Sequence, residues 1–290
     1  PRVGRSGVRH MQSTDVSAMV SLADSTAVVT GGGGGIGGAT SRLFAAAGAT
    51  VVVNDIDADL AQATVTDIEA DGGTAVAVVG DIREAVTIEE LHSTSTEVAG
   101  GAVDVLINNV GDYRPNGLFT ETDEDQWAAQ YEIQLHHVFR CTRTFLPAMR
   151  ERGRGAIINV STVEAFRGIP HNSTYSAFNA GVSAFTRSLA VEVGRDGIRV
   201  NCIAPDMADT LQTPGDRMLR GRDPQLIRSW IPLGRWGQPI DYAKVMLFLA
   251  SELSSFMTGN TLMVDGGTMA AGGWYGRADG RGWTNLPNRA

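Results

Sequence analysis

The sequence predicts an α/β fold, a doubly wound seven-stranded parallel sheet with helices on both faces. Two observations support this prediction. Short β-branched runs alternate with longer helical stretches, and no internal repeat or Pro-rich linker divides the chain. The apolar runs are continuous, as expected for strands that are buried on both faces. Ligands bind such sheets at the carboxyl ends of the strands, so site residues are expected directly after each strand.

The elements follow one another in strict alternation. Each strand is expected in a short run rich in Val, Ile and Thr, and these runs cover residues 26–30, 50–54, 74–79, 103–108, 156–160, 198–203 and 261–264. Each helix is expected in the longer stretch between two strands, as in repeated β-α-β units. The helical stretches cover residues 35–48, 58–71, 82–99, 123–151, 173–194 and 239–251.

Composition excludes several classes of protein. The 290 residues, 43% apolar and 19% charged, can bury a sizeable core and are not typical of a disordered chain. A net charge of −8 without a basic run argues against nucleic acid and anionic membrane surfaces as partners. No apolar run approaches the ~18 residues of a membrane span. Cys141 and Cys202 form no metal or redox motif, so we expect no metal site and buried thiols in a reducing, cytoplasmic location.

A single domain is expected over residues 22–267. Residues 1–21 are interpreted as a flexible tail, not a signal peptide, because Asp15 interrupts any apolar core. Residues 268–290 form an extension that carries Trp274, Tyr275 and Trp283 in a Gly-rich frame. Disordered tails seldom carry so many aromatic residues, and the glycines argue against a helix. We therefore expect the extension to lie extended, to dock on its own or a neighbouring subunit, and to close one side of the substrate pocket.

A glycine-rich loop joins the first strand to the first helix. It reads Thr30-Gly31-Gly32-Gly33-Gly34-Gly35-Ile36-Gly37. Glycines allow a tight turn and bring backbone N–H groups close to a pyrophosphate, and the helix N-terminus adds partial positive charge. The place of the loop inside a β-α-β unit indicates a dinucleotide-binding loop, not merely a flexible turn.

An acidic residue follows the second strand. Asp55 lies twenty residues beyond Gly35, the spacing at which a carboxylate reaches the adenosine ribose hydroxyls of a dinucleotide. A 2′-phosphate would be repelled there, and the glycine loop carries no Arg or Lys. The pattern predicts NAD(H) rather than NADP(H) as the cofactor.

From residue 22 to about 268 the chain resembles the short-chain dehydrogenase/reductase family, in its single-domain branch of ~250 residues. Thr30–Gly37 is similar to the family's TGxxxGIG, and Asn108-Asn109-Val110-Gly111 is similar to its NNAG. Asn201-Cys202-Ile203-Ala204-Pro205 with Thr210 resembles NxIxPGxxxT, except that Asp206 replaces the glycine. The stretches 231–237 and 264–267 match the family's late signatures.

The resemblance implies a Rossmann-like fold and a set of cofactor contacts. The Asp81-Ile82 pair would contact the adenine, and Thr210 would hold the nicotinamide carboxamide. The residues expected to bind the cofactor are Thr30, Gly31, Gly35, Ile36, Gly37, Asp55, Asp81, Ile82, Asn109, Val110, Gly111, Tyr175, Asn179, Pro205 and Thr210.

The catalytic set departs from the family's Asn, Ser, Tyr and Lys. Tyr175 keeps the tyrosine of the YxxxK motif, but Asn179 occupies the lysine position. Thr162 stands at the serine position, thirteen residues before Tyr175, and Gln134 stands at the asparagine position. Only one lysine, Lys244, is present in the chain, on a late helix.

The missing lysine changes the electrostatics of the tyrosine. A free tyrosine has a pKa of about 10, and lowering it to ~7 needs roughly 4 kcal/mol of preferential stabilisation of the phenolate. Asn179 carries no charge that could supply this, although its amide N–H could still hold a ribose hydroxyl. Asn179 and Gln134 also change both ends of the family's proton relay.

Three interpretations stay open. The first is an NAD-dependent dehydrogenase/reductase with a modified proton path, in which Tyr175 is the acid/base, Thr162 polarises the carbonyl and His171 assists. The second is a redox-neutral enzyme of isomerase or lyase type that keeps NAD. The third is a non-catalytic NAD-binding subunit. The alternative interpretation of His171 is an exposed loop residue.

Partners are expected to be a small-molecule substrate and further copies of the chain. Residues 206–235, called the lid segment below, should cover an apolar, medium-sized, cyclic or aromatic alcohol or ketone. Glu164, Phe166 and Tyr113 are expected pocket walls. The resemblance implies a homotetramer built by the two long helices at 123–151 and 173–194.

Overall fold

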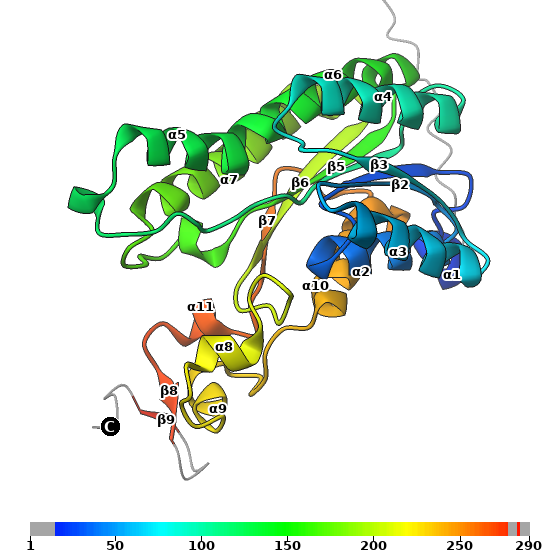
Figure 1. The fold of residues 1–290 in the computed structure, drawn as a ribbon. Coiled ribbons are helices and arrows are strands. Elements are labelled where there is room, and N and C mark those ends of the chain that lie inside the picture. The colour runs from blue at the N-terminus through cyan, green and yellow to red at the C-terminus, as the bar shows by residue number, and fades with distance from the viewer. Residues whose placement is uncertain (1–14, 278–282, 285–290) are drawn as a thin grey trace, which may run out of the picture.

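The computed structural model describes residues 15–277 and 283–284. At its centre is one seven-stranded sheet in the order β3-β2-β1-β4-β5-β6-β7, and every neighbouring pair is parallel (Figure 1). This confirms the fold class that the sequence predicts. The strands are β1 Thr26–Thr30, β2 Thr50–Asp55, β3 Thr74–Val79, β4 Val105–Asn108, β5 Gly155–Val160, β6 Ile198–Pro205 and β7 Thr261–Val264.

Helices cover both faces of the sheet (Figure 1). Helices α2, α3 and α10 pack on one face, where Phe44 and Met246 belong to the apolar core. Helices α4, α6 and α7 pack on the other, where Leu91 and Phe145 are buried. Their bounds are α2 Gly35–Ala46, α3 Ala58–Ala70, α4 Ala85–Ala99, α6 His137–Arg152, α7 Ser173–Val193 and α10 Pro239–Ala250.

The expected long helix at 123–151 is interrupted. Helix α5 Glu124–Tyr131 is followed by a π-helical segment, Glu132–His136, before α6 begins. A π turn is less favourable than regular helix and persists where side-chain contacts support it, often at functional sites. Here the supporting contacts come from Gln134, which lies in the segment and is buried.

The N-terminal tail is shorter than expected. Residues 16–20, assigned to a flexible tail, form helix α1 Val16–Val20. The reason is a helix cap, since the Asp15 carboxylate accepts a hydrogen bond from the Ser17 backbone N–H at 2.9 Å. Residues 1–14 of that tail lie outside the described residues.

The lid segment and the C-terminal extension form a small lobe at one end of the molecule (Figure 1). The lid contains α8 Gly215–Leu219 and α9 Leu226–Trp230, which the sequence did not predict. The extension begins with α11 Thr268–Ala271, contrary to the extended chain expected, and Gly272 and Gly273 with positive φ end this turn. Strand β8 Tyr275–Gly276 then pairs with β9 Trp283–Thr284 and lies against α9.

The strand order reverses direction between β1 and β4, and such a switch point opens a crevice at the carboxyl ends of the strands. Helix α2 begins there, directly against the glycine loop. An added Cβ at Gly37 would lie 1.9 Å from the Gly31 carbonyl oxygen, and one at Gly33 would lie 2.8 Å from the Ala61 nitrogen. Glycine at these positions therefore lets the turn, α2 and α3 meet in backbone contact.

Among the described helices, none is long and apolar enough to cross a membrane.

We expect Gly37→Ala to destabilise the protein by about 1–3 kcal/mol, because the added methyl group overpacks the turn. Urea unfolding measures this. Gly194→Ala is the matched control, since a Cβ there meets nothing within 4 Å. Equal free energies of unfolding for the two variants would contradict the packing argument.

Candidate active site

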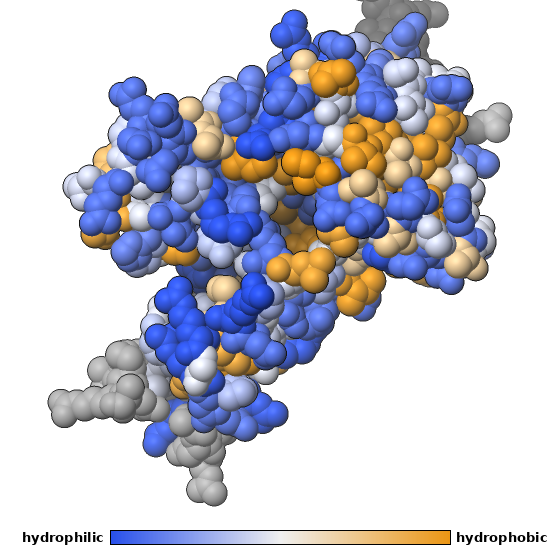
Figure 2. All heavy atoms as spheres, viewed as in Figure 1, coloured by the Kyte–Doolittle hydropathy of each residue, from blue (hydrophilic) through white to orange (hydrophobic). Residues whose placement is uncertain are grey.

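A cavity of about 600 Å³ opens at the carboxyl ends of the strands. Figure 2 shows the hollow on the molecular face, with hydrophobic residues around its mouth. Most of the site residues expected from the sequence line it together, although they come from separate elements. They are Gly31, Gly35, Ile36, Asp55, Asp81, Ile82, Asn109, Val110, Gly111, Gln134, Thr162, Tyr175, Asn179, Pro205 and Thr210.

Three expected site residues are not among the lining residues. Thr30 is buried, and its hydroxyl donates to the Ile107 carbonyl at 3.3 Å and accepts from the Asn109 N–H at 3.0 Å, which joins β1 to β4. Gly37 serves packing, as described above. His171 is exposed, has a left-handed backbone (φ 69°) and is not among the residues that line the cavity.

The glycine loop fits an anionic group such as a diphosphate. Gly34 is the N-cap of α2. Because glycine has no side chain, the N-cap makes no side-chain hydrogen bond to the backbone N–H groups of the first turn. Gly34 and Gly35 line the cavity, and a Cβ at Gly35 would point at Thr210, 3.5 Å away. The bare helix N-terminus therefore faces the space where a dinucleotide's phosphates would lie.

Two carboxylates line the far end of the cavity. Asp55 accepts hydrogen bonds from the Gly33 N–H at 3.0 Å and the Asp57 N–H at 3.1 Å, which fix its orientation. Asp81 forms a salt bridge with Arg83 at 2.5 Å, and this hydrogen-bonded guanidinium lowers the pKa of Asp81. Arg83 also lines the cavity, and the sequence analysis did not identify it.

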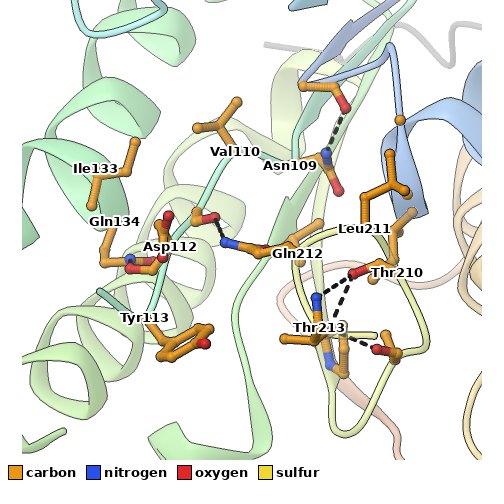
Figure 3. A pocket seen from close by; sticks show the side chains of 18 of the residues that line it. Asn109, Val110, Asp112, Tyr113, Ile133, Gln134, Thr210, Leu211, Gln212 and Thr213 are labelled. Carbon is orange, nitrogen blue, oxygen red and sulfur yellow. Dashed lines mark hydrogen bonds between the residues drawn. The ribbon is translucent and has the colours of Figure 1, made fainter. Parts of the chain in front are cut away.

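The first part of the lid segment closes one side of the cavity. Gln212 donates from Nε2 to the Gly111 carbonyl at 3.2 Å, and Thr210 is held by Thr213 (Figure 3). Beyond Thr213 the lid leaves the cavity, because α8 and α9 belong to the lobe. Of the segment 206–235 that is expected to cover the substrate, only residues within 206–213 line this cavity.

Only some of the other residues expected to form the pocket walls line the cavity. Tyr113 lines the cavity, whereas Glu164, Phe166 and the described residues of the C-terminal extension do not. Trp274 and Tyr275 are 52% and 39% exposed. The described part of the extension thus docks on α9 of its own chain but does not close the pocket, and the side chain of Trp283 lies outside the described residues.

Tyr175 and Thr162 line the cavity together and are hydrogen-bonded to each other. Burial raises the pKa of Tyr175 to about 12, and the hydrogen bond with Thr162 opposes this shift. The carboxylates of Glu164, Asp112 and Asp206 add to the increase. The phenol is therefore held in its protonated form across the neutral range.

Three amides occupy the space beside Tyr175. Asn179 donates from Nδ2 to the Tyr175 carbonyl at 3.0 Å and to Gln134 Oε1 at 3.3 Å. Gln134 donates to the Asp112 carbonyl and to Gln130 Oε1 at 3.4 Å. Both donors of Asn179 Nδ2 are engaged in this structure, which leaves Oδ1 as its atom free to accept a hydrogen bond from a ribose hydroxyl.

Gln130 completes this amide chain and was not identified from the sequence. It is buried and donates to the carbonyls of Asp112 and Pro115 at 3.4 and 3.3 Å. Its position four residues before Gln134, one helical turn, is the signal that could have revealed it. His137 nearby is buried, and desolvation lowers its pKa to about 4, so its ring is neutral. No cluster of metal-ligating side chains occurs in the described part of the chain.

Comparison with known proteins gives three consistent matches. A family model described as enoyl-(acyl carrier protein) reductase matches residues 31–269. The (2S)-[(R)-hydroxy(phenyl)methyl]succinyl-CoA dehydrogenase subunit BbsD of Thauera aromatica is 36% identical over 248 residues, 86% of this chain and 98% of that protein. A 7α-hydroxysteroid dehydrogenase, solved with NADH and 7-oxo glycochenodeoxycholic acid, has a TM-score of 0.81 at 31% identity, covering 87% of this chain and 96% of that one.

We expect Asn179→Lys to lower the pKa of Tyr175 by about 1–3 units, because a cation within a few ångströms stabilises the phenolate. Ultraviolet absorbance titration measures it, with Tyr175→Phe subtracted to isolate this tyrosine. Asn179→Leu, which adds no charge, should give no such decrease. An unchanged Tyr175 titration in a folded Asn179→Lys variant would contradict the electrostatic account.

Proposed function

Because the chain belongs to the short-chain dehydrogenase/reductase family of oxidoreductases, we propose that it interconverts a secondary alcohol and a ketone with NAD(H). One observation carries this proposal. The hydrogen-bonded hydroxyls of Tyr175 and Thr162 line the same cavity as the glycine loop and Asp55. Both halves of a hydride-transfer site, the cofactor end and the acid/base end, are thereby adjacent.

When bound, the cofactor supplies or accepts the hydride at the substrate carbon. In this structure the Thr162 hydroxyl donates to the Pro205 carbonyl at 3.4 Å, and with substrate bound it would rotate to donate this single proton to the substrate oxygen and polarise it. During reduction the Tyr175 O–H bond breaks and its proton forms the O–H bond of the alcohol, and the phenolate is reprotonated from solvent. Asn179 orients the ribose through Oδ1, held in place by Gln134 and the Tyr175 carbonyl.

The state of Tyr175 favours one direction. With a pKa of about 12, the phenol is almost fully protonated at pH 7. Ketone reduction uses the protonated phenol, which is almost fully populated, whereas alcohol oxidation needs the phenolate. We therefore propose ketone reduction as the direction that the protonated phenol favours at neutral pH. The amide chain from Asn179 to Gln130 stands in place of the family's proton relay, and it carries no titratable group.

The charge near Asp55 supports NAD(H) over NADP(H). The Asp55 carboxylate, fixed by the Gly33 N–H, would accept hydrogen bonds from the ribose hydroxyls and repel a 2′-phosphate. A 2′-phosphate would need a cation as its partner. Arg83 already forms an ion pair with Asp81, and Arg42 forms one with Asp67 at 2.8 Å.

The cavity walls support an apolar, medium-sized or cyclic substrate. Val110, Tyr113, Ile133, Met207 and Leu211 line the space. By its name, the relative from Thauera aromatica acts on a phenyl-substituted succinyl-CoA, and the structural neighbour acts on a hydroxysteroid. A homotetramer formed through α5–α7 and a cytoplasmic location stay predictions.

A panel of ketones with NADH tests the proposal, with consumption of NADH as the readout. Turnover supports it. NADH binding without turnover of any ketone or alcohol would reject it in favour of a redox-neutral enzyme or a non-catalytic subunit.

We expect NADH to bind about 100-fold more tightly than NADPH, because juxtaposed like charges cost several kcal/mol. Asp55→Ala should weaken NADH binding and narrow this gap, as measured by fluorescence titration. Asp59→Ala, an exposed carboxylate outside the cavity, is the control and should leave both affinities unchanged. Equal affinities of the unmodified protein for the two dinucleotides would refute the assignment.

Tyr175→Phe should reduce turnover by about 10²-fold or more, the scale of a lost general acid/base. NADH affinity should change less than twofold, since the phenyl ring keeps the packing. Steady-state kinetics and NADH titration measure the two effects. Full activity in this variant would exclude Tyr175 as the acid/base.

A further inference from the structure

Asp206 stands where the resembled motif has glycine, directly after β6. Its side chain lines the cavity and is only 4% exposed. A carboxylate in such a place requires partners, because an unpaired buried charge is strongly unfavourable. The structure provides them from two separate segments of the chain.

One partner is Arg167, on the segment after β5. Its Nη2 donates to both oxygens of Asp206 at 3.0 Å and to Glu164 Oε1 at 2.9 Å. The second is Thr268, in the first turn of α11, whose hydroxyl donates to Asp206 Oδ2. Asp206 therefore joins the end of β6 to the segment after β5 and to the start of the C-terminal extension.

The segment after β5 carries Thr162. The Glu164 N–H donates to Thr162 Oγ1 at 3.3 Å, and Thr162 Oγ1 donates to the Pro205 carbonyl at 3.4 Å. The ion pair at Arg167 thus lies in the same short hydrogen-bonded network as the hydroxyl that contacts Tyr175. A displacement of this segment would move Thr162 away from the substrate oxygen.

We infer that Asp206 is a positioning residue, which clamps the Thr162 segment against the end of β6 through Arg167 and anchors α11 through Thr268. The inference rests on the proposed function in one respect, that Thr162 and Tyr175 act on the substrate oxygen. The clamp itself is a property of the fold and can be measured without turnover.

The test compares Asp206→Asn, which keeps the side-chain size but removes the charge, with the unmodified protein. Asp71→Asn, an exposed carboxylate remote from the cavity, is the control. We expect kcat for ketone reduction to fall about 10- to 100-fold, the scale of a small misplacement of a reacting group, while the Kd of NADH changes less than twofold. The double variant Asp206→Asn/Arg167→Gln should lose less than the sum of the losses of the two single variants, because both changes break the Asp206–Arg167 pair, while Arg167→Gln also removes the contact with Glu164.

Hydrogen exchange supplies the readout that does not need turnover. Backbone amides at 162–167 should exchange faster in Asp206→Asn, with those of β1 and α2 unchanged. Unchanged exchange at 162–167 in Asp206→Asn would overturn the clamp. In a protein that reduces ketones, an unchanged kcat would also overturn it, and so would a loss of NADH affinity as large as the fall in kcat. If the unmodified protein reduces no ketone, the proposed function fails, and hydrogen exchange alone decides the clamp.

Discussion

The chemistry proposed for this site depends on one constraint, a half-buried phenol that has neutral amides beside it where the family places a cation. Burial raises the pKa of Tyr175 to about 12, the hydrogen bond with Thr162 offsets part of this increase, and three nearby carboxylates add to it. A site of this kind keeps a proton ready to donate but rarely offers an acceptor. Carbonyl reduction follows from that asymmetry more directly than alcohol oxidation does.

The rest of the architecture brings this phenol and the cofactor end together. The parallel sheet gathers loops from separate strands at one edge, and the backbone contact at Gly37 brings the N-terminus of α2 to the same edge. The π turn places Gln134 where its amide meets Asn179 and the Asp112 carbonyl. Substituting the amide side chains without this local change in the helix would leave buried polar groups without partners, which is costly.

Local patterns predicted most of the fold and the cofactor end of the site. The strands, the glycine loop and Asp55 are each specified by residues within one β-α-β unit, so their positions follow from spacing. The remainder depends on contacts between distant residues. Gln212 and Gly111 are 101 residues apart, and Asp206 and Thr268 are 62 apart, so no periodicity reveals either contact. Sequence spacing also could not show that His171 is exposed, with a left-handed backbone, and lies outside the cavity lining.

The pH dependence of both directions in one preparation tests the central claim most directly. With a phenol of high pKa, the rate of ketone reduction should change little through the neutral range, while alcohol oxidation rises about tenfold per pH unit without a plateau. An oxidation rate that levels off near neutral pH would show that the phenolate is already populated there. Such a plateau would contradict the account, because it would require a source of positive charge at Tyr175 that the amide chain does not provide.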